Sequence, residues 1–251
     1  MRRLWRPPLR GSVHVCGCGH SGTSILTRLV GAHSRIHAIP GESGVAKKES
    51  YGRYREALEQ FWRDSEAAGA DLWVEKTPKH VRHLGFILDA APTSRILLIC
   101  RNPLDTVASL KRRYGRLGKS LRRWKQDNAR VLRWREHPRA MLVRYEDLVR
   151  SPQASLDPVM RFLGLTFEAG QLGYHEQPVS WYGAAAPQEA AQEAARDATA
   201  SAIGHPENRN RQINQPLFDS TGSYSSHLDE GEIRHVRRSC QRLAHALGYS
   251  L

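Results

Sequence analysis

The sequence predicts an α/β fold in which a parallel sheet is covered by helices on both faces. Short runs of β-branched and aliphatic residues alternate with segments whose apolar residues recur at helical spacing. The short runs are almost continuously apolar, which is typical of strands buried on both faces. The chain has 251 residues, enough for one domain with a sizeable core. Ligands of such sheets bind at the carboxyl ends of the strands, so residues that follow each strand are the candidates for a site.

Five segments are expected to form the strands. They are residues 12–16, 35–39, 72–75, 95–100 and 140–145. The fourth has the strongest strand character, because aliphatic and β-branched residues run through it without interruption. Pro40 and Gly41 end the second strand.

Helices are expected between and after these strands. Apolar periodicity and helix-favouring residues place them at 24–32, 54–68, 80–90, 103–114, 120–135, 157–163 and 230–247. Pro103 is tolerated in a first helical turn, and Gly164 is a typical helix end. The stretch 183–209 is rich in Ala, Gln and Glu and almost lacks large apolar residues. It is expected to be a solvated helix over 187–200, a mobile lid or disordered.

The charge and the apolar content limit the partners and the compartment. The net charge is +13, mostly from arginine, which predicts an anionic partner such as a nucleic acid, an acidic glycan or a phosphate- or sulfate-bearing small molecule. The longest strongly apolar run is 96–100, far short of the ~20 residues of a membrane span. The basic N-terminus has no apolar region behind it, so neither a signal peptide nor an anchor is expected. The four cysteines are expected to be buried free thiols in a reducing, cytoplasmic compartment.

A glycine-rich turn follows the first predicted strand and precedes a helix, over residues 17–24 (G-C-G-H-S-G-T-S). Such a turn lets backbone N–H groups point inward beside a helix N-terminus, which favours a bound phosphate. Gly17 and Gly22 have the Walker A spacing, but Thr23 stands where that motif has lysine. The strongest strand ends in Arg101 rather than in an aspartate for magnesium. The turn therefore suits a phosphate but not nucleoside triphosphate hydrolysis.

Arg101 and Ser109 form a second candidate phosphate site. Arg101 emerges from the carboxyl end of the strongest strand, and Ser109 lies about two turns into the next helix, one turn after Asp105. An arginine fork with a hydroxyl suits a phosphate. The alternative is a strand-end arginine that pairs with Asp105.

Two motifs in this order resemble those of sulfotransferases that use 3′-phosphoadenosine-5′-phosphosulfate (PAPS). They are H-S-G-T-S at 20–24 and R-N-P-L-D-T-V-A-S at 101–109. Further likeness lies at 73–80 (W-V-E-K-T-P-K-H), 145–148, 162–165 and 246–249. The segment 73–80 resembles the E-K-[ST]-P segment of glycan-modifying and many bacterial members. The resemblance implies a P-loop NTPase-like three-layer fold with a five-stranded parallel sheet. It also implies sulfuryl transfer to a hydroxyl or amine of a small-molecule or glycan acceptor, without a metal and with adenosine 3′,5′-bisphosphate (PAP) as product.

The resemblance also implies roles for single residues. The 5′-phosphosulfate would be held by Gly19, His20, Ser21, Gly22, Thr23 and Ser24, and the 3′-phosphate by Arg101 and Ser109. The whole of 11–251 would be one domain, in which 175–225 is a lid or acceptor loop, and 208–225 would close over the donor.

Three residues are the catalytic candidates. Glu42 follows the second strand and is proposed as the general base. Lys76 follows the third strand and would neutralise the leaving phosphate. His20 stands where many relatives have Arg or Lys, and a bound anionic donor would favour its charged form. Lys79 and His80 are expected to help bind donor or acceptor, and His80 is the second choice as base.

Other readings stay open at this point. A small-molecule kinase is the first alternative, and a magnesium requirement would indicate it. A basic nucleic-acid-binding module is the second, since 111–139 holds twelve Lys or Arg, but an amphipathic helix with a solvated basic face is favoured there. The pairs His33/His37 and His80/His83 have metal-ligand spacing, but no thiol or carboxylate signature accompanies them, so no metal is expected.

Overall fold

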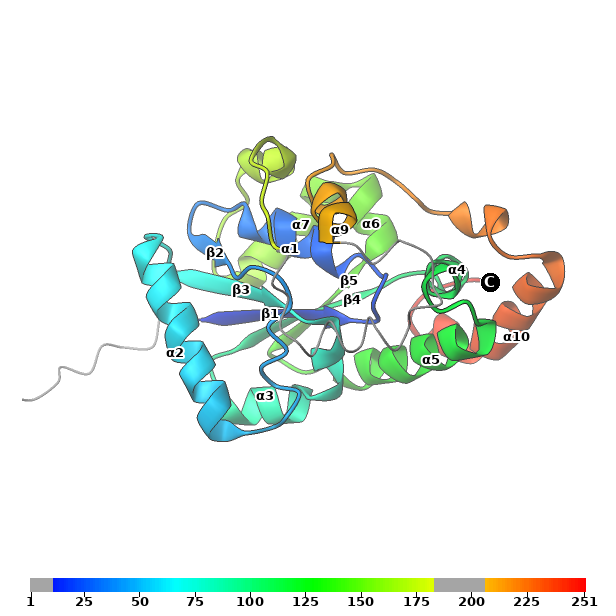
Figure 1. Cartoon of the computed structure of the whole chain (residues 1–251), viewed down its shortest axis with the longest axis horizontal. Helices are drawn as coiled ribbons and strands as arrows, with labels where there is room; N and C mark the ends of the chain where they lie inside the picture. The colour runs from blue at the N-terminus through cyan, green and yellow to red at the C-terminus, as the bar shows by residue number, and fades with distance from the viewer. Residues whose placement is uncertain (1–10, 183–205) are drawn as a thin grey trace, which may run out of the picture.

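The computed structural model describes residues 11–182 and 206–251, which form three layers around one sheet (Figure 1). The strands are β1 (Ser12–Gly17), β2 (Ile36–Ala38), β3 (Leu72–Lys76), β4 (Arg95–Cys100) and β5 (Ala140–Arg144). Their order is β2-β3-β1-β4-β5, and every neighbouring pair is parallel. The expected α/β fold with a five-stranded parallel sheet is therefore confirmed.

The sheet separates two apolar layers because side chains alternate along each strand. Val13 and Val15 of β1 lie on one face with Leu97 and Ile99 of β4, and Cys16 lies on the other face. All of these side chains are buried, as expected for a sheet covered on both sides.

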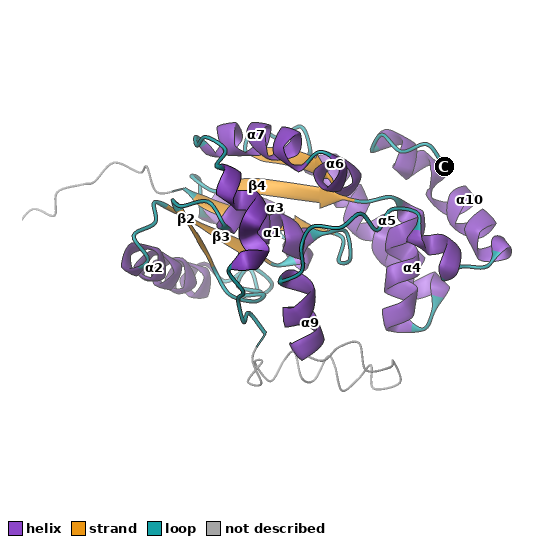
Figure 2. Ribbon diagram, turned by 90° about the horizontal axis from the view of Figure 1, so that it is seen from above, coloured by secondary structure: helices purple, strands orange, loops and turns teal. Residues whose placement is uncertain are grey.

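Helices cover both faces, and Figure 2 shows α1, α6 and α7 lying over one of them. That layer is made by α1 (Thr23–Gly31), α6 (Tyr145–Arg150), α7 (Pro152–Leu163) and the 3₁₀ helix η2 (Ala169–Glu176). The other layer is made by α2 (Tyr51–Ala67), η1 (Pro78–Arg82), α3 (Leu84–Ala90), α4 (Pro103–Tyr114), α5 (Leu117–Trp134) and α10 (Glu230–Ala246). Two further elements are α9 (Pro206–Ile213) and η3 (Ser223–Ser226).

Some element boundaries differ from the expectation. The single helix expected at 80–90 is wrong, because His83 leaves the helical region (φ −122°, ψ 19°) and divides η1 from α3. The helix α7 begins at Pro152 rather than at 157, and Pro158 lies inside it, where a proline normally interrupts a helix. The short helix α6 was not expected. It begins at Tyr145, which the sequence assigned to the fifth strand.

Two expectations on composition can be compared with the structure. All four cysteines lie in the described part of the chain, and all are buried free thiols. Within residues 11–182 and 206–251, no helix is both long and apolar enough to cross a membrane. The helix considered at 187–200 lies outside the described residues.

Candidate active site

The glycine-rich turn after β1 is held close against the neighbouring strand. A Cβ at Gly17 would lie 2.3 Å from the carbonyl oxygen of Ile99 on β4, so only glycine fits there. Gly22 has φ +94°, and a Cβ there would lie 2.6 Å from the ring of Tyr145. The backbone thus turns sharply into α1, as a phosphate-binding loop requires.

The turn presents hydrogen-bond donors that have no acceptor among the described residues. Gly22 occupies the N-cap position of α1 and has no side chain to cap the first-turn N–H groups. The Ser21 hydroxyl is fully buried, and no hydrogen-bond partner reaches it within the described residues. An anion at this helix N-terminus would supply the missing acceptors. Thr23 is buried in the first turn, and Ser24 is half-buried beside it.

His20 connects the turn to α4. Its backbone is left-handed (φ +70°), and its Nδ1 lies 2.8 Å from Ser109 Oγ. The arginines whose charges act on the ring are Arg113, Arg123, Arg209 and Arg101. Burial, and then these charges, lower the pKa of His20 to about 4. In the free protein at neutral pH, His20 is therefore uncharged, and the arginines supply the positive potential around the turn.

Arg101 leaves the end of β4 with its guanidinium almost buried, 7% exposed. Nη2 donates to the carbonyl oxygen of Ser220 at 2.7 Å, and the guanidinium lies 4.3 Å from the centre of the Tyr145 ring. Its distance to Asp105 Oδ1 is 3.9 Å, so the expected alternative pairing is at most loose. The buried Nε has no partner among the described residues. Arg101 thus keeps a donor free for an anion.

Asp105 instead anchors the segment after α9. It accepts hydrogen bonds from the backbone N–H groups of Gly222 and Tyr224, each at 3.0 Å. Together with the contact between Arg101 and Ser220, these bonds place 220–224 beside the end of β4.

Glu42 and Lys76 meet at the other side of β1. Lys76 Nζ donates to Glu42 Oε1 at 2.9 Å and to the Tyr182 hydroxyl at 2.8 Å, and its side chain is only 1% exposed. Arg209 Nη2 donates to the same Glu42 oxygen at 2.8 Å and stacks 3.7 Å from the centre of the Tyr182 ring. Burial alone would raise the pKa of Glu42, but the charges and hydrogen bonds of Lys76 and Arg209 prevail and lower it to about 2.

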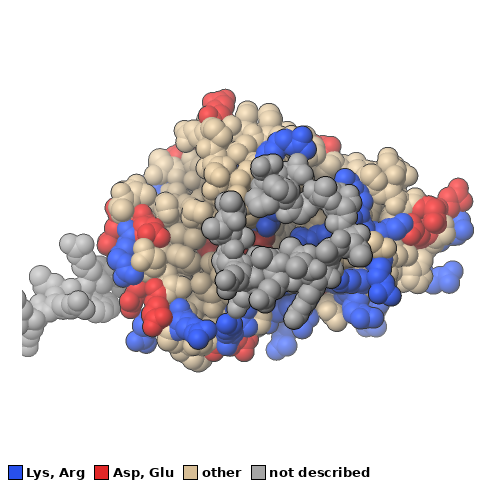
Figure 3. All heavy atoms as spheres, in the orientation of Figure 1, with Lys and Arg blue, Asp and Glu red and all other residues tan. Residues whose placement is uncertain are grey.

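The two halves of the site meet through Arg209, whose charge acts on both His20 and Glu42. Figure 3 shows Lys and Arg side chains gathered on the part of this face where Figure 1 places α4 and α5. The structure thus brings His20 to Ser109 and Glu42 to Lys76, with a surplus of cations between them.

Sequence reasoning missed two of these residues as site residues, Arg113 and Arg123. Arg113 and Arg123 lie in the basic stretch expected to be a solvated helix face. Trp124 and Val131 on the apolar face of this helix are buried, but Arg123 turns toward Asp127 and the glycine turn. Tyr182 and Arg209 lie in the expected lid 175–225, and Arg209 also lies in the segment expected to close over the donor, but their contacts with Lys76 and Glu42 were not expected.

The expected role of His80 is wrong. Its side chain is fully buried, and Nδ1 lies 3.1 Å from the carboxylate of Glu75. It cannot contact a donor or an acceptor at this site, nor act as the second-choice base. Lys79 as a binding residue stays a prediction.

Comparisons with known proteins agree with this geometry. A family model described as "Sulfotransferase family" matches residues 41–169, more than half of the chain, and a "Sulfotransferase domain" model matches residues 119–248. The chain belongs to the sulfotransferase family. As a sulfotransferase it is an enzyme, and the kinase and nucleic-acid readings find no support in these matches. A comparison with curated proteins finds no match.

Three solved sulfotransferases have the same fold as this chain. The sulfotransferase domain of the olefin synthase of Synechococcus PCC 7002 has a TM-score of 0.65 at 16% identity, over 96% of this chain and 95% of that one. A mouse sulfotransferase solved in complex with PAP has a TM-score of 0.61 at 13% identity, over 97% and 90% of the two chains. The sulfotransferase domain from the curacin biosynthetic pathway has a TM-score of 0.57 at 18% identity, over 96% and 99%. This likeness supports the P-loop NTPase-like fold.

Proposed function

We propose that this sulfotransferase moves the sulfuryl group of PAPS to a hydroxyl or an amine of a small-molecule or glycan acceptor. The observation that carries the donor assignment is a pair of buried polar atoms without partners in the described residues, Ser21 Oγ and Arg101 Nε. They lie at the ends of β1 and β4, where the resemblance expects the two phosphate groups. The mouse structure in complex with PAP supports the same donor.

The donor would bind across β1. The glycine turn Gly19–Ser24 would hold its 5′-phosphosulfate, and Arg101 and Ser109 would hold its 3′-phosphate. PAPS supplies an activated sulfuryl group and a good leaving phosphate. The surrounding arginines and Lys76 would balance the charge of this anion, which supports the expectation of a donor held without a metal.

In the free protein Glu42 is too weakly basic to take a proton, because Lys76 and Arg209 stabilise its charged form. A bound phosphosulfate competes for both cations and loosens their hold on Glu42, which raises its pKa. Glu42 then accepts the acceptor proton as the acceptor oxygen or nitrogen forms its bond to sulfur. The bond from sulfur to the bridging oxygen breaks, and Lys76 stabilises the negative charge that develops on the phosphate of PAP.

The acceptor would approach from the side of Glu42 and Tyr182. The Glu42 side chain is 34% exposed, so a hydroxyl can reach it from solvent. We propose that 175–225 forms a lid on the acceptor side. The support is that Tyr182 contacts Lys76 and that Arg209 contacts Glu42. The cytoplasm stays the proposed compartment, supported by the four free thiols.

Calorimetric titration tests the donor first. We expect PAP to bind with a Kd in the micromolar range or tighter, and ATP with magnesium not to bind measurably, because the turn lacks the lysine and the strand-end aspartate for that nucleotide. A preference for magnesium ATP would overturn the proposal.

His20 makes PAP binding depend on pH in a defined direction. The free ring has a pKa of about 4, and phosphate groups beside it favour the protonated form and raise the pKa in the complex. The complex then binds more protons than the free protein, so affinity increases as pH falls. If the bound pKa returns to about 6.5, this contribution reaches roughly tenfold between pH 7.5 and 5.5.

At each pH, the PAP Kd of His20→Gln is divided by the PAP Kd of wild type. This ratio isolates the effect of His20, because protonation of PAP itself changes both Kd values equally. We expect the ratio to rise as pH falls. A ratio that stays constant would mean that His20 does not take up a proton with the ligand.

A further inference from the structure

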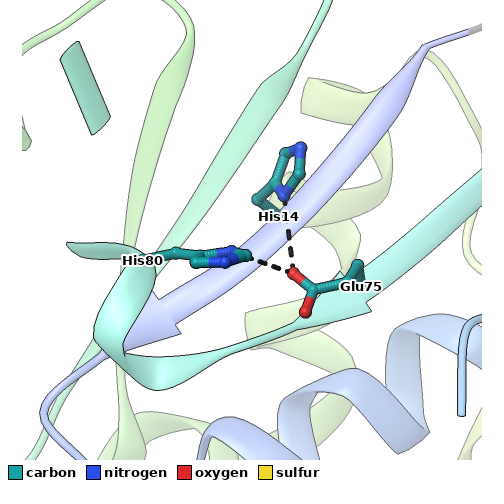
Figure 4. A group of neighbouring side chains, drawn as sticks. All are labelled: His14, Glu75 and His80. Carbon is teal, nitrogen blue, oxygen red and sulfur yellow. Dashed lines mark ion pairs between the residues drawn. The ribbon is translucent and has the colours of Figure 1, made fainter. Parts of the chain in front are cut away.

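A fully buried group of titratable side chains lies beneath the proposed catalytic pair, and the proposed reaction does not use it. It consists of His14 from β1, Glu75 from β3 and His80 from η1 (Figure 4), each with 0% exposure. Burial of a charged carboxylate is costly unless hydrogen bonds satisfy it. The surroundings of Glu75 show which groups do so.

Three hydrogen-bond donors and two histidine nitrogens surround the Glu75 carboxylate. Oε1 accepts hydrogen bonds from the backbone N–H of Ser43 at 3.1 Å, from the Ser43 hydroxyl at 2.6 Å and from the Thr77 hydroxyl. Oε2 faces Nδ1 of His80 at 3.1 Å and Nδ1 of His14 at 3.5 Å. Burial would raise the pKa of Glu75, but the two histidines hold it well below its usual range. Glu75 is therefore a charged acceptor at the centre of this group.

The same three side chains have the composition of a metal site, since their ligand atoms lie within 4.8 Å of one another. The other nitrogen of His80 argues against this reading. The backbone N–H of Ala46 donates to His80 Nε2 at 3.3 Å, and an amide nitrogen can only donate. Nε2 is thus the accepting nitrogen, and Nδ1 is the nitrogen that points toward Glu75. A metal ligand usually donates from its second nitrogen instead.

Side chains in and around this group accept hydrogen bonds from the backbone of the loop immediately after Glu42. Ser43 N–H is bound by Glu75, and Gly44 N–H by Thr77 Oγ1 at 3.0 Å. The next two N–H groups, of Val45 and Ala46, are bound by Ser43 Oγ at 3.4 Å and His80 Nε2 at 3.3 Å. Four consecutive amides of a segment outside helices and strands are thus bound by side chains.

We propose that Glu75, Thr77 and His80 form a clamp that fixes loop 43–46 and thereby holds Glu42 against Lys76. These three are positioning residues, because none of them contacts the reacting groups. Lys76 lies between Glu75 and Thr77 in the chain, so one strand end carries both the clamp and the proposed catalytic cation. The inference that the clamp matters for catalysis rests on the proposed function of Glu42 as general base.

Thr77→Val tests the clamp without a change of charge, and Thr77→Ser restores the hydroxyl as the matched control. In Thr77→Val we expect hydrogen exchange of amides 43–46 to accelerate at least about tenfold. We also expect protonation of Glu42, followed by ¹³C NMR over the acidic range in which the protein stays folded, to move to higher pH, because its contact with Lys76 loosens. Thr77→Ser should resemble wild type in both measurements.

Ser43→Ala provides a second test should Thr77→Val fail to fold, with Ser65→Ala as its control. Ser65 is also buried and donates to a backbone carbonyl, that of Phe61 in α2, far along the chain from the loop. Ser43→Ala should accelerate exchange at Val45 and raise the pKa of Glu42, whereas Ser65→Ala should do neither. Unchanged exchange and an unchanged Glu42 titration in Thr77→Val or Ser43→Ala would overturn the clamp.

Calorimetry with PAP separates this inference from the proposed function. In all four variants the PAP Kd should stay within about threefold of wild type, since the glycine turn and Arg101 are untouched. Wild-type protein that does not bind PAP would refute the donor assignment and leave the clamp standing. Normal PAP binding with an unresponsive loop would refute the clamp alone.

Discussion

Glu42→Gln is expected to reduce turnover by at least about 10³-fold while PAP binds as well as to wild type. The amide keeps the shape of the side chain and can still accept a hydrogen bond from Lys76, but it cannot take a proton from the acceptor. The substitution removes a negative charge near the proposed donor, so it gives no reason for anion binding to weaken. The loss should therefore appear in the transfer step and not in the affinity for PAP.

Transfer of ³⁵S from labelled PAPS to a panel of phenols, glycosides and acidic glycans measures this effect, with calorimetry against PAP in parallel. Glu49→Gln is the matched control, because Glu49 is an exposed carboxylate of the same loop region that pairs with His83. It should transfer as wild type does. Full turnover in Glu42→Gln would remove Glu42 as the base, and His80 could not replace it because it is buried beside Glu75.

Arg101→Ala is expected to weaken PAP binding by about 100-fold or more but binding of adenosine 5′-phosphate by no more than about threefold. Only PAP carries the 3′-phosphate, and the Arg101 guanidinium lies in a nearly buried position with Nε unpartnered in the described part of the chain. Removal of one member of a buried, charge-assisted contact commonly costs about 2–5 kcal/mol, which corresponds to roughly a 30-fold to several thousandfold change in Kd, a range that includes the expected loss.

Parallel calorimetric titrations of the two nucleotides give the comparison. Arg130→Ala controls for the general loss of one positive charge, since Arg130 is only half-buried on α5 and donates to the carbonyl of Gln126. It should affect both nucleotides equally and weakly. Equal losses for the two nucleotides in Arg101→Ala would contradict the assignment of the 3′-phosphate.

Much of this arrangement could be predicted because it depends on local rules. The apolar runs place β4 at its observed boundaries. The glycines after β1 predict a turn, and Gly17 of this turn lies so close to Ile99 that no larger residue fits. Glu42, Lys76 and Arg101 follow directly from the rule that ligands meet strand ends. Once the topology is predicted, a residue that follows a strand end can be identified as a candidate site residue.

The remainder depends on contacts between distant segments. Arg209 reaches Glu42 across 167 positions of the chain, and only the folded structure brings them together. His80 follows a strand end as Lys76 does, yet η1 turns it inward to Glu75. Whether a strand-end residue faces solvent or the core depends on the backbone angles of the next few residues, which motif spacing does not encode. The lowered pKa of His20 likewise depends on burial and on arginines from three helices and from the end of β4.

The strand order has a consequence for how such a protein can diverge. In the strand order β2-β3-β1-β4-β5, the proposed base for the acceptor follows β2, and the groups proposed for the 3′-phosphate follow β4 on the other side of β1. Substitutions that reshape one flank need not disturb the other, since the glycine turn stands between them. A lineage can therefore exchange its acceptor while it retains its sulfuryl source, and selection can act on the two specificities separately.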